Sequence, residues 1–79
     1  ALNLTFWPPS TAGHYLTARV AVTNDDLDTA NTAYQDAIAA APDTASAAYL
    51  AERALPVAIG AGDMKAALRL SQTIANPKQ

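Results

Sequence analysis

Alanine supplies about half of the apolar residues in this 79-residue chain, and this preference constrains the fold more than any other feature. Alanine is the strongest helix former, whereas the β-branched residues that favour strands are sparse and scattered here. Its methyl side chain also lets neighbouring helices pack closely. The composition therefore predicts an all-α protein whose helices lie close together.

Apolar residues recur at helical spacing along four segments, and short breaks of Asn, Asp, Pro or Gly separate these segments. The second segment is the clearest, because its apolar residues form a single stripe from Leu27 to Ala41. Pro56 interrupts the third segment and is expected to bend it. The predicted helices cover about residues 11–23, 26–40, 44–59 and 63–75.

A residue suited to capping a helix stands at the start of each segment. The side-chain oxygens of Ser, Thr and Asp accept hydrogen bonds from backbone N–H groups that the first helical turn leaves without partners. We expect this role for Ser10 or Thr11, for the segment Asn24-Asp25-Asp26, for Thr44 and for Asp63.

Short turns between successive helices predict two antiparallel helical hairpins, over about residues 11–41 and 44–75. Both hairpins belong to one helical domain spanning residues 10–79, because a chain of this length forms at most one domain. Residues 1–9 are expected to lie outside it as an extended arm.

The predicted arm over residues 1–9 has its own pattern. Leu2, Leu4 and Phe6 alternate with polar residues, and two prolines then exclude a helix. With Trp7 they bring four large apolar side chains into seven residues, too few to form a core of their own. We expect these side chains to be buried either against the first hairpin or against a partner protein.

Four residues of the second predicted helix follow a known repeat pattern. A small residue, Ala30, is followed by the aromatic Tyr34, then by Ala37 and Pro42, at offsets of 4, 7 and 12. This spacing resembles the second helix of a tetratricopeptide repeat (TPR), and Ala18 falls on the small-residue position of the first helix. The alanines allow close helix crossing and Tyr34 is expected to fill the groove between helices.

Other positions depart from the TPR pattern. In the first repeat, the two aromatic positions fall on His14 and Ala21. In the second, a Gly-Asp turn precedes a helix with Ala67 in the small-residue position, but Ser71 replaces the usual aromatic and Pro56 is foreign to the family. The interval between the first and the second repeat is about three residues longer than the family period of about 34 residues.

The resemblance covers about residues 12–75 and is closest to the alanine-rich bacterial type of TPR protein. It implies a fragment of an α-solenoid, in which helical hairpins stack on one another. It also implies a scaffold that binds other proteins, with no cofactor.

Residue content argues against catalysis and metal binding. The chain has no cysteine, and His14 is its single histidine, so it cannot form a His-His metal pair or a Cys-His site. Asp25, Asp26 and Asp28 form an acidic cluster, but no EF-hand loop follows them. Helix capping is the favoured role for this cluster. We expect a protein that is not an enzyme and has no cofactor and no metal.

Charge argues against two further classes of partner. The net charge is −2, and the five Lys and Arg residues are spread singly along the chain. A nucleic-acid interface or a polybasic membrane patch needs basic residues concentrated together. No uncharged apolar run approaches the roughly 20 residues that span a bilayer. Peripheral association with a membrane through a partner protein stays possible.

Two helical positions are candidates for partner binding besides the arm. Arg53 could hold a carboxylate of a partner through paired hydrogen bonds, although a solvated helix face is the alternative. In the last helix, Ala66, Leu70 and Ile74 form an apolar face opposite the side that carries Met64. We expect this face to lack a neighbour within the chain. The candidate partner-binding residues are thus Leu2, Leu4, Phe6, Trp7, Arg53, Ala66, Leu70 and Ile74.

These observations favour a protein-interaction scaffold or an accessory subunit of a larger, possibly membrane-associated assembly. The alternative is an amino-terminal helical solenoid of a larger enzyme whose catalytic domain lies outside this chain. The chain begins at Ala1 rather than at a methionine, which is typical of a processed form or a fragment. An exported or periplasmic location is favoured over a cytoplasmic one.

Overall fold

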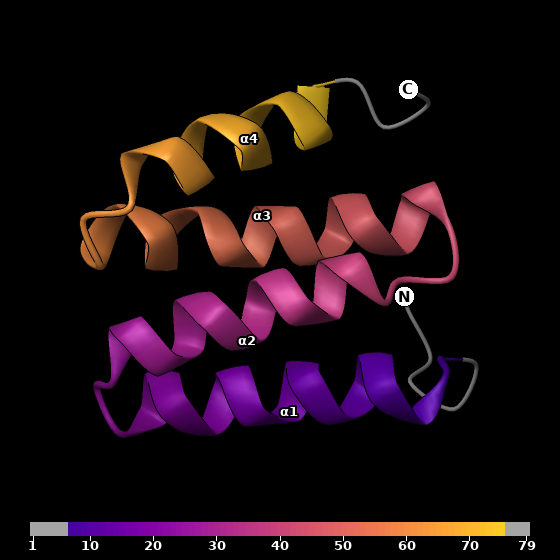
Figure 1. Cartoon of the computed structure of the whole chain (residues 1–79), viewed down its shortest axis with the longest axis horizontal. Coiled ribbons are helices and arrows are strands. Elements are labelled where there is room, and N and C mark those ends of the chain that lie inside the picture. The colour runs from indigo at the N-terminus through magenta and orange to yellow at the C-terminus, as the bar shows by residue number, and fades with distance from the viewer. Residues whose placement is uncertain (1–6, 76–79) are drawn as a thin grey trace.

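The computed structural model describes residues 7–75, and these residues form four α-helices and no strands (Figure 1). The prediction of an all-α protein is confirmed for this part of the chain. The helices are α1 (Pro9–Thr23), α2 (Leu27–Ala39), α3 (Thr44–Gly60) and α4 (Met64–Ala75). None of them is both long enough and apolar enough to cross a membrane.

The four helices lie side by side in chain order, and each one runs back along the helix before it (Figure 1). Extensive contacts join α1 to α2, α2 to α3 and α3 to α4. The inner helices α2 and α3 therefore have neighbours on two sides, whereas α1 and α4 are the outermost helices.

Aspartate side chains cap α2 and α4, as predicted. The Asp26 carboxylate accepts a hydrogen bond from the Thr29 amide at 3.2 Å, and the Asp63 carboxylate accepts one from the Ala66 amide at 3.1 Å. Each carboxylate satisfies a backbone donor of the first turn and lies near the positive end of the helix dipole.

Helix α3 is capped by Asp43 rather than by the predicted Thr44. The Asp43 carboxylate accepts a hydrogen bond of 2.7 Å from the Ser46 amide. Extended backbone angles at Asp43 bring its side chain over the first turn, whereas Thr44 is already helical. An aspartate directly before the threonine was therefore the better candidate.

The predicted cap of α1 was wrong, because the helix begins at Pro9, inside the predicted arm. Proline suits the first helical position, since its φ angle is already helical and it has no N–H to satisfy. Neither Ser10 nor Thr11 caps the helix. The Thr11 hydroxyl instead donates a hydrogen bond of 2.6 Å to the Ala40 carbonyl at the end of α2.

The core consists of alanines at the helix crossings and of larger side chains between them. Ala18, Ala30 and Ala37 are completely buried, and Tyr34 is buried among them, as the pattern of small and aromatic residues led us to expect. Leu50 of α3 is the largest apolar side chain with no exposure at all. Close crossing at alanine positions thus compensates for the small number of large apolar residues.

Helix α3 continues through Pro56 to its end at Gly60. Proline cannot donate the hydrogen bond that the Glu52 carbonyl would otherwise accept. Both Glu52 and Pro56 are exposed, so that carbonyl can bond to water. The bend expected at Pro56 stays a prediction.

Candidate protein-interaction surfaces

Four aromatic side chains, one from the segment before α1 and one from each of α1, α2 and α3, meet edge to face. The Trp7 ring centroid lies 5.5 Å from that of Tyr15 in α1 and 6.2 Å from that of Tyr49 in α3. Tyr15 lies 6.2 Å from Tyr34 of α2 and 6.3 Å from Tyr49. Such contacts add to the stability that burial alone provides. The cluster therefore joins α1, α2 and α3.

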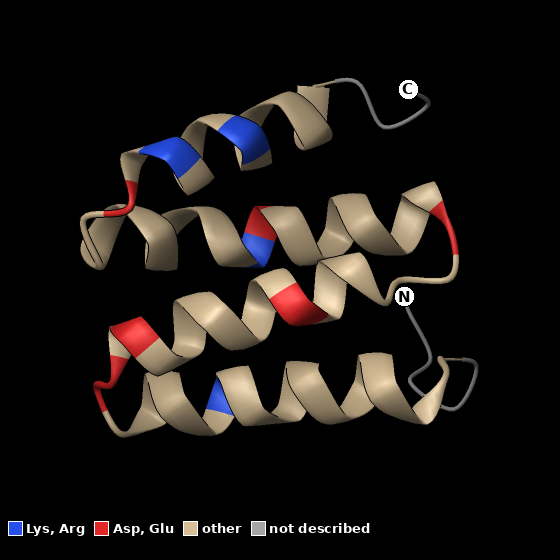
Figure 2. Cartoon of the chain, in the orientation of Figure 1, with Lys and Arg blue, Asp and Glu red and all other residues tan. Residues whose placement is uncertain are grey.

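An exposed arginine lies over a tyrosine ring on each of α1 and α3. The guanidinium carbon of Arg19 is 5.8 Å from the Tyr15 ring centroid, and that of Arg53 is 4.5 Å from the Tyr49 ring centroid. The negative face of each ring attracts the cation above it. Figure 2 marks these basic positions on α1 and α3. Because the two rings are in contact, the arginines share one side of the molecule.

The tyrosines of this cluster differ in acidity. Burial raises the pKa of Tyr15 and of Tyr34, and hydrogen bonding to Tyr49 raises the pKa of Tyr15 further. Hydrogen bonding from Tyr15 and then from Arg53 lowers the pKa of Tyr49. The Tyr15 hydroxyl and the Arg53 guanidinium thus favour the charged form of Tyr49.

The tyrosine and arginine of α1 recur in α3 as part of one short repeat. The sequence Tyr-Leu-x-x-Arg starts at Tyr15 and again at Tyr49, 34 residues later. This repeat is hidden when the two hairpins are aligned on their second helices, α2 and α4. The sequence interval between α2 and α4 is longer than 34 residues, because α3 has 17 residues and α1 only 15. Comparing the chain with itself at an offset of 34 would have identified Arg19 as a companion of Arg53.

Three of the predicted arm residues, Leu2, Leu4 and Phe6, lie outside the described residues. Trp7 is described and is buried within this chain. Its indole N–H donates a hydrogen bond of 3.0 Å to the Ser46 hydroxyl at the start of α3. Of the two expectations for Trp7, folding back on the helices is the one observed.

The apolar face predicted to be free on α4 is packed instead. Ala66 and Leu70 are buried and Ile74 is partly buried against the core. The exposed large apolar residues of α4 are Met64 and Leu68, at 57% and 62% of their full exposure. The assignment of the two faces was therefore reversed.

Polar contacts also join the first part of α4 to α2. The Asn31 amide nitrogen donates a hydrogen bond of 3.0 Å to the Asp63 carboxylate, directly before α4. One turn into α4, the Arg69 guanidinium donates a hydrogen bond of 2.8 Å to the Gln35 side-chain oxygen. These bonds connect Asp63 and Arg69 to α2, whereas Met64 and Leu68 are exposed.

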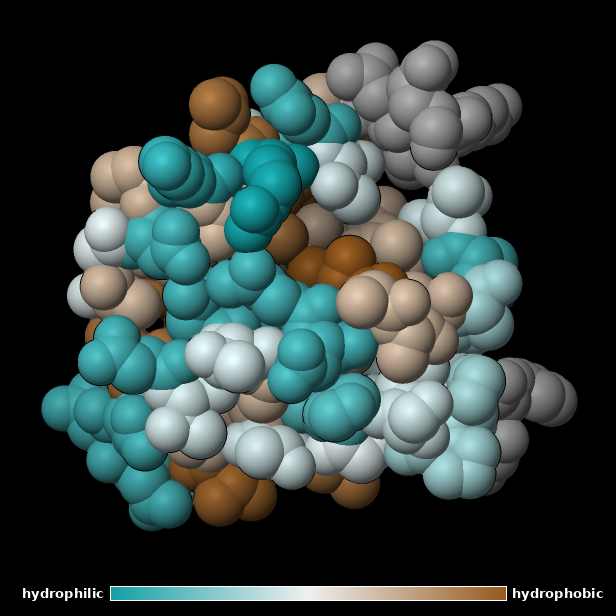
Figure 3. Space-filling model, viewed as in Figure 1, coloured by the Kyte–Doolittle hydropathy of each residue, from teal (hydrophilic) through white to brown (hydrophobic). Residues whose placement is uncertain are grey.

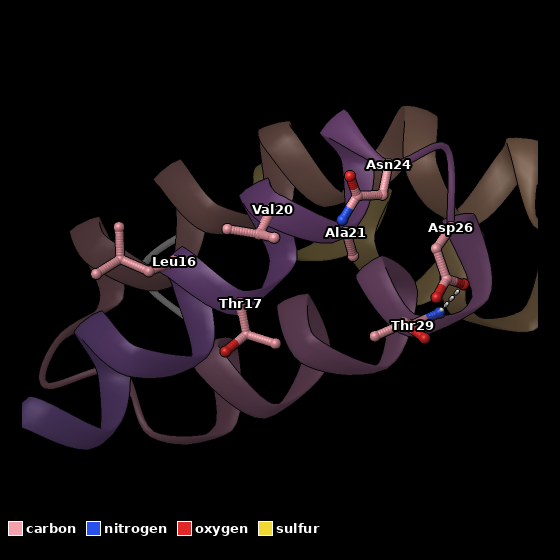
Figure 4. Close-up of a pocket in the computed structure, with 7 residues that line it drawn as sticks. All are labelled: Leu16, Thr17, Val20, Ala21, Asn24, Asp26 and Thr29. Atoms are coloured by element: carbon pink, nitrogen blue, oxygen red, sulfur yellow. Dashed lines mark hydrogen bonds between the residues drawn. The ribbon is translucent and has the colours of Figure 1, made fainter.

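A second apolar surface lies on the outer side of α1, where Leu16 and Val20 are exposed. Figure 3 shows hydrophobic surface along the outer edge of α1 and at that of α4. Beside Leu16 and Val20 is a hollow of about 400 Å³. In Figure 4 these two residues follow one another along α1, Asn24 comes just after its end, and Asp26 and Thr29 lie beside them at the start of α2.

Comparison of the chain with protein-family models, with curated proteins and with solved structures finds no match. Within residues 7–75, no three His, Cys, Asp or Glu side chains lie close enough together to hold a metal ion. The candidate sites described above are the Tyr-Arg surface (Tyr15, Arg19, Tyr49 and Arg53) and the exposed apolar sides of α1 and α4.

Proposed function

We propose that this chain is a protein-interaction scaffold, or an accessory subunit of a larger assembly, built from TPR-like helical hairpins. In this proposal α1 with α2 and α3 with α4 form the two hairpins, stacked as a fragment of an α-solenoid. Two observations support it: successive helices run in opposite directions (Figure 1), and Tyr-Leu-x-x-Arg recurs at a 34-residue interval.

The Tyr-Arg surface is where we place the partner. A guanidinium group presents its donors in a planar fork that matches a carboxylate, and a ring beneath it limits its motion before binding. Ordering a side chain in advance reduces the entropy lost when a ligand binds. Arg19 and Arg53 therefore suit a partner segment that carries two acidic groups, or one acidic side chain and a terminal carboxylate.

One observation carries this proposal most directly. Arg19 and Arg53 are both exposed, stand at equivalent positions of the 34-residue repeat, and lie over tyrosines whose rings are 6.3 Å apart. A role in stability alone does not need a guanidinium group at either position, since the tyrosines are held by Trp7 and by each other.

Binding to peptides tests the proposal. Peptides with acidic residues and a free carboxyl terminus are compared with the same sequences in amide form, by fluorescence anisotropy. We expect Arg19→Gln with Arg53→Gln to weaken binding of the acidic peptides about tenfold or more, because charge-assisted hydrogen bonds are lost. Arg69→Gln is the matched control, since Arg69 bonds to Gln35 on another part of the surface. Equal losses in both variants would contradict the proposal.

A second candidate function is that of a helical part of a larger enzyme. The exposed Leu16 and Val20 on α1 and Met64 and Leu68 on α4 favour it, because inner repeats of a long solenoid carry apolar residues on both sides. The encoding gene separates the two candidates. A reading frame that joins this segment to a domain with catalytic motifs would favour the enzyme.

A further inference from the structure

The repeat allows the outer side of α1 to be compared with the same side of α3. Leu50 of α3 is completely buried, whereas its counterpart Leu16 of α1 is 50% exposed. One turn later, Ala54 is completely buried and its counterpart Val20 is 61% exposed. Within the described residues, α3 packs against both α2 and α4, whereas the extensive helix contacts of α1 are with α2. The outer side of α1 thus exposes apolar residues at positions that are buried in α3.

The outer side of α4 carries side chains like those with which α2 covers α3. Leu27 at the start of α2 packs on Gly60 at the end of α3. A Cβ added to Gly60 would lie only 2.9 Å from the Cδ1 atom of Leu27. Met64 stands at the start of α4 as Leu27 does at the start of α2, and Leu68 follows one turn later. Helix α4 therefore offers two apolar side chains in the positions that face the next helix.

Charges near these two surfaces are complementary. Asp25 and Asp26 follow the end of α1, and Lys65 lies in the first turn of α4. If α4 packs on an α1 helix as α2 packs on α3, the start of α4 lies beside the end of α1. Lys65 then faces the acidic turn. Figure 2 shows this acidic turn and the basic positions of α4 toward the same end of the molecule.

We propose that copies of this chain associate head to tail. The outer side of α4 in one copy, with Met64, Lys65 and Leu68, packs on the outer side of α1 in the next, with Leu16 and Val20. The hollow beside Leu16 and Val20 receives an apolar side chain of α4 (Figure 4). This association goes beyond the proposed function, because neither surface includes Arg19 or Arg53.

The two interacting surfaces are different, so each copy keeps one of them free after pairing. Such heterologous contacts build rings or open rods rather than closed dimers. A single pair of helices buries less than a standard protein interface, so the association is weak and depends strongly on concentration. The charge pairs also make it weaker at high salt.

Sedimentation velocity over a concentration series tests this arrangement. The wild-type chain is expected to form oligomers as its concentration rises toward the millimolar range. Val20→Glu blocks the α1 surface and Leu68→Glu blocks the α4 surface, because an unpaired charge would be buried in an apolar contact. We expect each variant alone to be monomeric. A mixture of the two is expected to form a heterodimer that grows no further, since each variant retains one intact surface.

Thr32→Glu is the matched control, because Thr32 is exposed on α2 and belongs to neither surface. This variant is expected to associate like the wild type, and circular dichroism confirms that all variants keep their helices. A wild-type chain that stays monomeric at every concentration would overturn the proposal and point to a different protein, or to further helices, as the cover of these surfaces. Loss of association in only one of the two variants would indicate pairing of like surfaces and overturn it too.

The charge pairing has its own measurement. Lys65→Glu is expected to weaken association about tenfold or more, because it places like charges beside each other. The same variant is expected to associate better, not worse, as salt is added. If Lys65→Glu associates as strongly as the wild type at low salt, the head-to-tail orientation is wrong.

Discussion

Helices α1 and α3 share the sequence Tyr-Leu-x-x-Arg but differ in what surrounds it. In α3 the leucine, Leu50, is completely buried, and in α1 the leucine, Leu16, is half exposed. The tyrosines are alike in packing against Trp7, and the arginines are alike in lying over the tyrosines. The side of the helix that faces the aromatic cluster is therefore conserved between the repeats, whereas the opposite side depends on neighbouring helices.

This difference teaches where the stability of the domain originates. A leucine contributes fully to stability only when other atoms surround it, so the same residue stabilises the protein much more in α3 than in α1. A small domain has few such positions, and its stability is expected to be about 4–12 kcal/mol. Removing one buried side chain can thus eliminate a large part of this free energy of unfolding.

The largest expected effect comes from Trp7, which connects the two helices of this comparison. Trp7→Ala is expected to reduce the free energy of unfolding by about 3–5 kcal/mol, because the ring contacts with both tyrosines are lost and a cavity remains. Urea titration measures this change. Trp7→Phe keeps an aromatic ring and loses the N–H bond to Ser46, so it should cost only about 1–2 kcal/mol. Equal costs would show that Trp7 does not bridge α1 and α3.

The two leucines give the sharpest contrast. Leu50→Ala is expected to lower the free energy of unfolding by about 2–5 kcal/mol, because it removes buried methyl groups and leaves a cavity. Leu16→Ala is expected to lower it by less than about 1 kcal/mol, because half of the side chain is already in water. Thermal unfolding of dilute samples measures both. Similar losses would mean that another helix covers α1 in solution.

One glycine in α1 and one in α3 differ in the same way, with smaller expected changes in stability. At Gly13 of α1 an added Cβ meets no atom within 4 Å, so Gly13→Ala is expected to stabilise the protein by about 0.5–1 kcal/mol through helix propensity. At Gly60 of α3 the Cβ would meet Leu27 at 2.9 Å, so that side chain must move. Gly60→Ala is expected to give no gain or a small loss in melting temperature. A gain equal to that of Gly13→Ala would show that α2 is not closely packed on α3.

Acid is expected to have the smallest effect, and it acts on the caps of α3 and α4. Hydrogen bonds from Ser46 lower the pKa of Asp43, and those from Asn31 and from the Ala66 amide lower the pKa of Asp63, both below the ordinary value of 3.8. A lowered pKa in the folded state stabilises the fold above the unfolded value. This stability is lost as the pH falls below 3.8 toward the folded pKa values.

Urea titrations between neutral pH and pH 3 measure this acid effect. The Asp63→Asn variant still accepts hydrogen bonds at the helix start but no longer titrates, so its stability should fall less with acid than that of the wild type. If the two proteins lose stability in parallel, Asp63 makes no contribution to the acid response.

Parts of the fold were predictable because they depend on residues close together in the chain. Asp26 and Asp63 cap the helices that follow them, and Pro42 follows the end of α2, as local chemistry requires. Tyr34 was placed in the core from its spacing to Ala30 and Ala37. The start of α1 was misjudged because Pro9 was taken as a barrier to a helix, although proline is favoured at its first position.

The candidate surfaces were less predictable from the sequence. Arg53 was identified on its own, but its partnership with Arg19 needed the 34-residue repeat and the contact between Tyr15 and Tyr49. Both sides of α4 carry apolar residues at helical spacing, so periodicity could not decide which side is packed. Packing against the rest of the core decided it, and the accompanying bonds from Asn31 to Asp63 and from Arg69 to Gln35 join residues more than 30 positions apart.

The sequence by itself determined the fold class and the breaks between the helices: an alanine-rich helical chain, two of its caps and its lack of cysteine. These follow from backbone preferences and from composition, which act within a few residues. The tertiary structure alone decided which apolar side chains are buried. Trp7 packs into the cluster, Leu16 stays half exposed while Leu50 is enclosed, and α4 turns Met64 and Leu68 outward. Burial depends on which helices become neighbours, because a side chain is removed from water only by atoms that distant parts of the chain bring to it.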